Sequence, residues 1–172
     1  MKRILQITLV VIVAGLAYFV WTWMNPSPEL AIRRQMEKLG ETLQGKPGEG
    51  NIARVAAINR TLSFFTADVQ INADGMAQVS DSITGRTELQ QALFAARQRL
   101  SGAITFHEMN VMVAPEQTNA TVNFTAVAQL SGQDAPYSQD LRAFFVKLEG
   151  DWLINRVEAI ALRPPTSGNS TN

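Results

Sequence analysis

A segment of 21 residues without a charged side chain, Ile4 to Met24, constrains this chain more than any other feature of its sequence. In a helix, roughly 20 apolar residues span the hydrocarbon core of a bilayer. Lys2 and Arg3 precede the segment, and aromatic residues that favour the headgroup region gather near its far end. The pattern predicts a single-pass anchor in the inner (cytoplasmic) membrane, with residues 1–3 in the cytoplasm and the rest of the chain in the periplasm or another extracytoplasmic space.

A cleaved signal peptide is the alternative interpretation of the same segment. Gly15-Leu16-Ala17 resembles a cleavage site made of small residues. The apolar run continues past this point through Tyr18, Phe19 and Val20, and this continuation favours an uncleaved anchor.

The composition excludes several classes of protein. The chain has 15 basic and 15 acidic residues, one histidine and no cysteine. A neutral chain is not typical of nucleic-acid-binding domains, and the missing cysteines exclude disulfides, a thiolate nucleophile and a cysteine-based zinc site. One histidine is too few for a mononuclear zinc site, and no glycine-rich phosphate loop is present. We therefore expect no metal, no cofactor and no nucleic-acid partner.

Residues 25–163 are expected to form one domain, followed by a disordered polar tail at residues 164–172. Three helices are predicted in this domain from their capping residues and apolar spacing. The first starts at Ser27 and Pro28 and buries Ile32, Met36, Leu39 and Leu43. The second covers about residues 51–65 and buries Val55, Ile58, Leu62 and Phe65. The third starts at a Thr87–Gln90 capping box, ends at Gly102 and buries Leu89, Leu93, Ala96 and Leu100.

Strands are predicted in the remainder of the domain. Asp74-Gly75 suits a two-residue hairpin turn, and Gly150-Asp151 suits another. The predicted strand pairs are 69–73 with 76–80, 104–113 with 120–130, and 141–149 with 152–162. Helices followed by an antiparallel meander predict an α+β layer fold in which the sheet curls around the helices.

This order of elements resembles the cone-shaped fold shared by nuclear transport factor 2, ketosteroid isomerase and the SnoaL-like polyketide cyclases. Residues 65–71 resemble the helix-to-strand passage of this superfamily, residues 83–86 its Gly-Arg lead-in to the third helix, and residues 145–154 its final hairpin. The resemblance covers about residues 29–162. It implies a curved antiparallel sheet packed on three helices, an internal pocket for a small apolar ligand, and a homodimer formed through the open face of the sheet.

The same resemblance implies no particular reaction. The position that matches the carboxylate base of the isomerases is Ala73, whose methyl group accepts no proton. No tyrosine lies between Tyr18 and Tyr137 to serve as an oxyanion donor from the first two helices. The catalytic groups of the isomerases are therefore not expected.

Two residues are weak candidates for proton transfer. His107 alternates with Met109 and Val111 along its predicted strand, so it is a candidate general base if that face lines the pocket. A half-exposed strand residue without a catalytic partner is the favoured interpretation. Asp74 lies one position beyond the matched base, but its place in the predicted hairpin turn explains it without catalysis.

Other residues are candidates for lining the pocket, although an ordinary apolar core is the favoured interpretation of the apolar ones. These candidates are Phe65, Met76, Met109, Phe124, Phe144, Trp152, Arg156 and Glu158. Strict alternation places Arg156 and Glu158 on the strand face of Trp152 and Ile154, as a polar patch in an apolar cavity. A bulge or a solvated rim explains them equally well.

The sequence therefore predicts a non-catalytic, membrane-anchored extracytoplasmic module for binding or assembly. The alternative is a small-molecule enzyme or carrier, isomerase-like or cyclase-like, that uses the pocket with His107 or Asp74.

Overall fold

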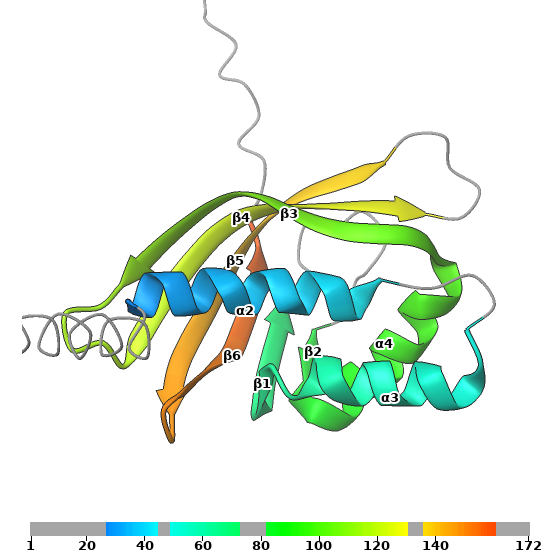
Figure 1. The fold of residues 1–172 in the computed structure, drawn as a ribbon, viewed down its shortest axis with the longest axis horizontal. Coiled ribbons are helices and arrows are strands. Elements are labelled where there is room, and N and C mark those ends of the chain that lie inside the picture. Colours follow the sequence, from blue (N-terminus) through cyan, green and yellow to red (C-terminus); the bar gives the residue numbers. More distant parts are fainter. Residues whose placement is uncertain (1–26, 45–48, 73–81, 131–135, 161–172) are drawn as a thin grey trace, which may run out of the picture.

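The computed structural model describes residues 27–44, 49–72, 82–130 and 136–160, which form three helices and six strands (Figure 1). The predicted anchor, the turn at Asp74-Gly75 and the tail at residues 164–172 lie outside the described residues. Within the four described ranges, no helix combines the length and the apolarity needed to cross a membrane.

Helix α2 (Pro28–Leu43) forms as the sequence predicts. The Ser27 Oγ accepts a hydrogen bond from the Leu30 backbone N–H at 3.3 Å. Pro28, at the first helical position, has no N–H that would need a partner. This N-terminal cap confirms the predicted start of the helix.

The buried face of α2 packs closely on strand β3 (Leu100–Val113). Ile32, Met36 and Leu39 are buried on this face, as predicted from their spacing. Gly40 shares the face, and a Cβ there would lie 3.4 Å from the Ile104 carbonyl oxygen and 3.5 Å from the Phe106 ring. The missing side chain therefore allows the helix to approach the strand closely.

Helix α3 (Asn51–Leu62) is shorter than predicted, because Phe65 begins a strand instead of ending the helix. Val55 was expected to be buried, and this expectation is wrong, since Val55 is 40% exposed. The helix packs against α2 and helix α4 (Gly85–Arg99) through residues nearer its C-terminal end. The buried residues of α3 are Ile58, Thr61 and Leu62.

Helix α4 starts before the predicted capping box at Thr87. Its first residue, Gly85, has φ of +81°, a conformation that favours glycine. The Glu88 carboxylate accepts a hydrogen bond from the Thr84 backbone N–H at 2.7 Å. Leu100, predicted to be the last buried helical residue, instead begins β3.

The sheet is mixed, and its strands follow the order β2-β1-β6-β5-β4-β3. The other strands are β1 (Phe65–Asn72), β2 (Ile83–Thr84), β4 (Asn119–Leu130), β5 (Tyr137–Leu148) and β6 (Asp151–Ala159). Strands β3 to β6 form the predicted antiparallel meander, and β2 pairs with β1 antiparallel. The β1–β6 pair is parallel, so the prediction of a wholly antiparallel sheet is wrong. The chain passes through β2, α4 and strands β3 to β5 before β6 pairs with the other side of β1, and such a long crossover is what parallel pairing requires.

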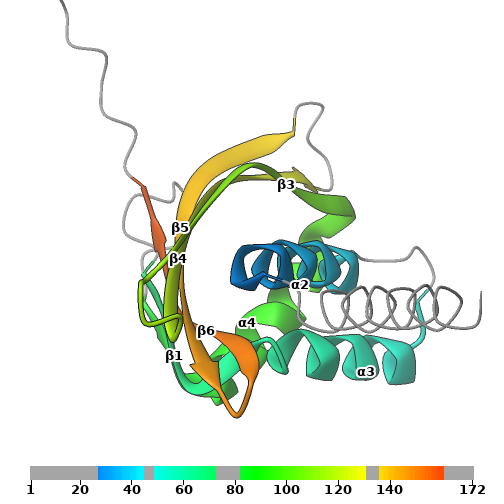
Figure 2. The same cartoon turned by 60° about the vertical axis from the view of Figure 1, so that its left-hand side comes forward.

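The sheet curves around α2, and the three described helices lie on its concave side (Figure 2). The core fills the space between this side of the sheet and the helices. Its buried residues are Ile32, Met36, Leu39, Ile58, Leu62, Phe65, Val69, Leu89, Ala120, Val122, Phe124, Ala143, Phe145, Trp152 and Ile154. The outer face of the sheet is uncovered by these helices (Figure 2).

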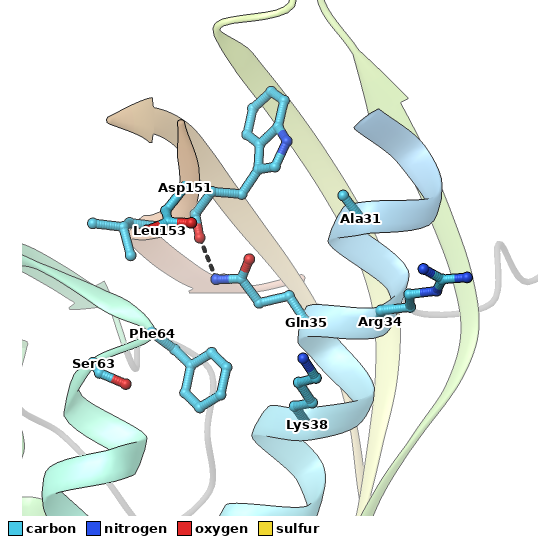
Figure 3. A pocket seen from close by; sticks show the side chains of 9 residues that line it. Ala31, Arg34, Gln35, Lys38, Ser63, Phe64, Asp151 and Leu153 are labelled. Carbon is cyan, nitrogen blue, oxygen red and sulfur yellow. Dashed lines mark hydrogen bonds between the residues drawn. The ribbon is translucent and has the colours of Figure 1, made fainter. Parts of the chain in front are cut away.

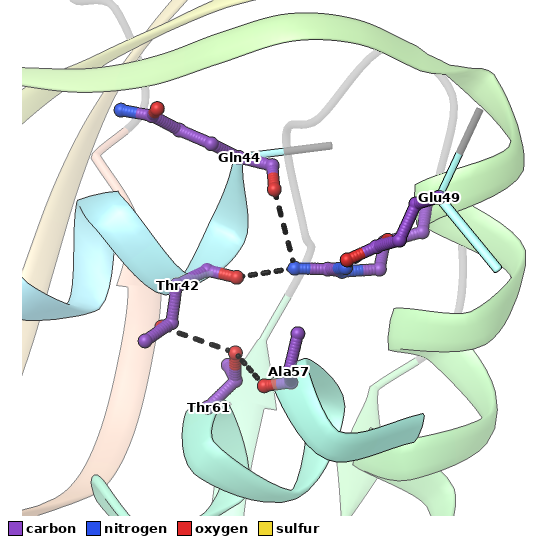
Figure 4. A network of polar contacts seen from close by, with 6 residues as sticks. Thr42, Gln44, Glu49, Ala57 and Thr61 are labelled. Carbon is purple, nitrogen blue, oxygen red and sulfur yellow. Dashed lines mark hydrogen bonds and ion pairs between the residues drawn. The ribbon is translucent and has the colours of Figure 1, made fainter. Parts of the chain in front are cut away.

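The side chain of Arg97, near the end of α4, is nearly buried and bonds to groups at the end of α2 and just before α3 (Figure 4). The Arg97 Nη1 of α4 lies 2.7 Å from the Glu49 Oε2, just before α3. Its Nη2 donates hydrogen bonds to the carbonyls of Thr42 and Gln44 at the end of α2, the latter at 3.3 Å. The last carbonyls of a helix have no partner within it, so Arg97 satisfies two of them.

We expect Arg97→Gln to lower the free energy of unfolding by about 3 kcal/mol, because it leaves a nearly buried carboxylate and two carbonyls without their charged partner. The side chains of this pair are 4% and 13% exposed. The matched control is Arg33→Gln, which removes the Arg33–Glu29 pair, whose side chains are 37% and 53% exposed. This control should cost less than about 1 kcal/mol. Urea unfolding of both variants checks the prediction, and equal losses would contradict it.

Candidate functional site

The concave side of the sheet, where a pocket was expected, contains large apolar side chains. Phe65, Phe124 and Trp152 are buried in the core, and Met109 packs half-buried against it. The rings of Phe124 and Phe106 meet edge to face, with their centroids 5.2 Å apart. The structure therefore places these four predicted pocket-lining residues within or against the core.

A bulge in β6 moves the predicted polar patch to the other side of the sheet. Ile154 pairs with Phe145, but Arg156 pairs with Phe144, so Asn155 is an extra residue in β6. Paired residues share a face, and Phe145 is buried on the concave side. Arg156 and Phe144 therefore lie on the outer face.

The same register pairs Glu158 with Arg142, which also places Glu158 on the outer face. The expectation that Arg156 and Glu158 face the cavity with Trp152 and Ile154 is wrong. The bulge, which was the open alternative, accounts for their position, because one extra residue reverses the face of every residue that follows it.

Polar side chains on the outer face are joined by specific contacts. The Arg142 Nε donates to the Asn123 Oδ1 at 2.8 Å, and its Nη1 lies 3.4 Å from the Glu158 Oε1. The Thr125 hydroxyl donates to the Asp140 Oδ1 at 2.7 Å. The Arg156 guanidinium lies over the Phe144 ring, 4.0 Å from its centroid. We call the outer face around these residues the outer sheet face.

His107 lies on the outer sheet face, in register with Thr125. Its Nε2 lies 2.9 Å from the Thr105 hydroxyl, and none of the described carboxylates is its hydrogen-bond partner. The expected alternation of His107 with Met109 and Val111 is interrupted, because Glu108 has φ of +52° and the register shifts between His107 and Asn110. His107 is therefore an exposed strand residue.

A groove of about 310 Å³ lies between α2 and the edge strand β3. Its lining residues are Glu37, Gly40, Glu41, Gln44, Ile104, Thr105, Phe106, His107 and Met109. His107 thus borders a groove that also carries two carboxylates from α2, although this groove is outside the concave core.

A second groove, of about 360 Å³, lies between α2 and the start of β6 (Figure 3), and we call it the α2–β6 groove. Its lining residues are Ala31, Arg34, Gln35, Lys38, Ser63, Phe64, Asp151, Trp152 and Leu153. The Gln35 Nε2 donates a hydrogen bond to the Trp152 carbonyl across it. The sequence reasoning missed this groove, although Arg34 and Lys38 stand four residues apart, the spacing that places both on one side of a helix.

Two remaining site predictions, Asp74 and Met76, lie outside the described residues. Among the residues that the structure describes, no three His, Asp or Glu side chains gather as metal ligands would.

No family model and no curated protein matches this chain in sequence. Solved structures match it in fold. A proposed aromatic ring hydroxylase from Novosphingobium aromaticivorans is 18% identical with a TM-score of 0.59, over 79% of this chain and 90% of that one. A proposed scytalone dehydratase from the same bacterium is 16% identical with a TM-score of 0.55, over 77% and 82%.

An NTF2-like protein with a cystatin-like fold, also from Novosphingobium aromaticivorans, is 14% identical with a TM-score of 0.59, over 90% of this chain and 92% of that one. The chain therefore has the α+β fold of NTF2-like proteins, with a mixed six-stranded sheet and three helices. This confirms the fold that the sequence resemblance implied, apart from the parallel strand pair. At these identities the likeness concerns the fold alone.

The assignment of faces predicts unequal costs for two phenylalanines. Phe124→Ala should lower the free energy of unfolding by about 4 kcal/mol, because it leaves a cavity in the core. Phe144→Ala should cost about 1 kcal/mol, since the ring lies on the outer sheet face beneath Arg156. Urea unfolding of the full chain measures both values. If Phe144→Ala cost as much as Phe124→Ala, the face assignment would be wrong.

Proposed function

We propose that the chain is a non-catalytic binding or assembly module, held outside the cytoplasmic membrane by the segment at residues 4–24. One observation carries the proposal: the concave side is packed with apolar side chains, whereas a set of hydrogen-bonded polar side chains lies on the outer sheet face. A small-molecule active site needs convergent polar groups in a concave, water-excluding pocket. Polar groups on an open face suit recognition of another macromolecule.

The anchor follows from the sequence of residues 4–24. Its length suits one crossing of the bilayer, and Lys2 and Arg3 favour a cytoplasmic N-terminus. The domain then lies in the periplasm or another extracytoplasmic space.

We expect the chain to remain in the membrane fraction after an alkaline wash and to keep its full mass of 18.9 kDa. Ile12→Arg together with Leu16→Arg should release it, because each charge costs about 3 kcal/mol near the centre of a spanning helix. Membrane fractionation with mass spectrometry measures both properties. A shortened chain in the soluble fraction would instead support the cleaved signal peptide.

The outer sheet face also suits pairing with a second copy of the chain. It carries charges of both signs, Arg142 and Arg156 with Asp140 and Glu158, so a two-fold arrangement can match each charge with its opposite. Phe144 supplies an aromatic centre, and Met112, in register with the neighbouring Thr121, is 49% exposed. Aromatic, methionine and arginine side chains are enriched in protein interfaces.

We expect the full chain in detergent to be a dimer, and Phe144→Glu to weaken the dimer at least about tenfold by burying an unpaired charge at the interface. The control is Ile52→Glu, which changes a side chain that is 89% exposed on α3, away from the sheet. Light scattering with correction for detergent gives the mass. A monomeric wild-type chain, or equal effects of the two variants, would argue against this interface.

A small-molecule enzyme or carrier is the second candidate. One observation favours it: the groove between α2 and β3 places His107 alongside Glu37 and Glu41. The two candidates differ in their response to His107→Ala, which would stop proton transfer in an enzyme but would leave the dimer of a binding module intact.

A further inference from the structure

The α2–β6 groove combines apolar walls with a polar crossing. Phe64, just before β1, and Leu153, near the start of β6, are both half-buried and contribute apolar surface. The Gln35 side chain crosses the groove to the Trp152 carbonyl (Figure 3). A volume of about 360 Å³ falls within the range of small-molecule sites.

Two cations on the lining of the groove are uncompensated. Among the described residues, neither Arg34 nor Lys38 has a hydrogen-bond or ion-pair partner, whereas the adjacent Arg33 pairs with Glu29 at 3.1 Å. Figure 3 shows Lys38 extending toward Gln35, with Arg34 on the outer flank of α2. Asp151 is the single acidic residue on the lining. The lining therefore has a net positive charge and suits an anionic group.

The groove lies along the middle of α2, the helix that follows the predicted anchor in the sequence. That anchor ends at Met24, and α2 starts at Pro28. Lys38 is ten residues further along α2, within about 15 Å of its start. Two exposed apolar residues adjoin residues of the lining: Leu30, next to Ala31 and 41% exposed, and Leu148, which pairs with Asp151 and is 49% exposed. Exposed apolar side chains beside cations are typical of surfaces that contact lipid headgroups.

We propose that the α2–β6 groove binds the headgroup of an anionic phospholipid from the membrane that holds the anchor. The phosphate oxygens accept hydrogen bonds from Lys38, Arg34 on the outer flank of α2 adds positive charge nearby, and the apolar part of the lipid lies against Phe64 and Leu153. Asp151 accepts a hydrogen bond from a headgroup hydroxyl, as in phosphatidylglycerol. The inference rests on the proposed anchor, because the anchor brings the groove to the bilayer.

The test measures amine labelling of Lys38, relative to Lys147, in the full chain in maltoside micelles, which contain no phosphate. Phosphatidylglycerol added to the micelles should slow the labelling of Lys38 about tenfold, the effect expected of one charge-assisted contact. Diacylglycerol and inorganic phosphate are the comparison arms, and neither should protect Lys38. Unchanged labelling with phosphatidylglycerol overturns the proposal. Equal protection by inorganic phosphate overturns the lipid source, and equal protection by diacylglycerol overturns the role of the phosphate.

Variants provide a second measurement. Phosphatidylglycerol should raise the Tm of the wild-type chain. Lys38→Gln should weaken this lipid binding about tenfold, and Arg34→Gln should weaken it less, because Arg34 acts only through its charge. The control Arg54→Gln removes a cation of α3 that does not line the groove, so it should leave lipid binding unchanged. If this control weakened lipid binding as well, the assignment of the site to the α2–β6 groove would be wrong. Micelles present lipid whether or not residues 4–24 anchor the chain in cells. Release of the chain by the alkaline wash would therefore contradict the anchor alone, whereas absence of lipid binding in micelles would contradict the groove alone.

Discussion

Helix α2 buries Ile32, Met36 and Leu39 against the concave side of the sheet, and the closeness of this contact determines how the other elements are arranged. Full burial of each such side chain stabilises the fold by about 1.5–3 kcal/mol. Gly40 allows the helix axis to approach the backbone of β3 at Ile104. At the end of α2, Arg97 binds its last carbonyls and Glu49, so α3 and α4 are positioned relative to the same helix.

Two of the register shifts in the sheet determine which face several polar side chains occupy. The extra residue Asn155 in β6 moves Arg156 and Glu158 to the outer sheet face, and the shift at Glu108 in β3 separates the face of His107 from that of Met109. Without these shifts, strict alternation would direct charged groups into an apolar interior, at a cost of several kcal/mol for each unpaired charge. The bulges therefore keep the core apolar and concentrate the polar groups outside.

The parts of the fold that were predictable depend on local signals. The cap at Ser27 and the spacing of Ile32, Met36 and Leu39 predict α2, and the alternation from Ala120 to Leu130 predicts β4. The parallel β1–β6 pair depends on contacts between distant segments, for which local periodicity carries no signal. The bulges at Glu108 and Asn155 carry no glycine, and the partners of Arg97 lie about 50 residues away along the chain. The candidate site was predicted less well than the fold, because a one-residue shift changes the face of a side chain without changing its strand.

The concave side of this fold serves either as a core or as a pocket, because the same volume cannot hold both large side chains and a ligand. In this chain it holds Phe65, Phe124, Phe145 and Trp152, all of them buried. The chain has no cysteine and so no disulfides, and this apolar burial must provide much of its stability. Enlarging a pocket there would require removing these side chains, at about 3–5 kcal/mol each. Recognition on the outer sheet face and in the α2–β6 groove avoids that cost, because the residues that line these surfaces are separate from most of those that stabilise the core.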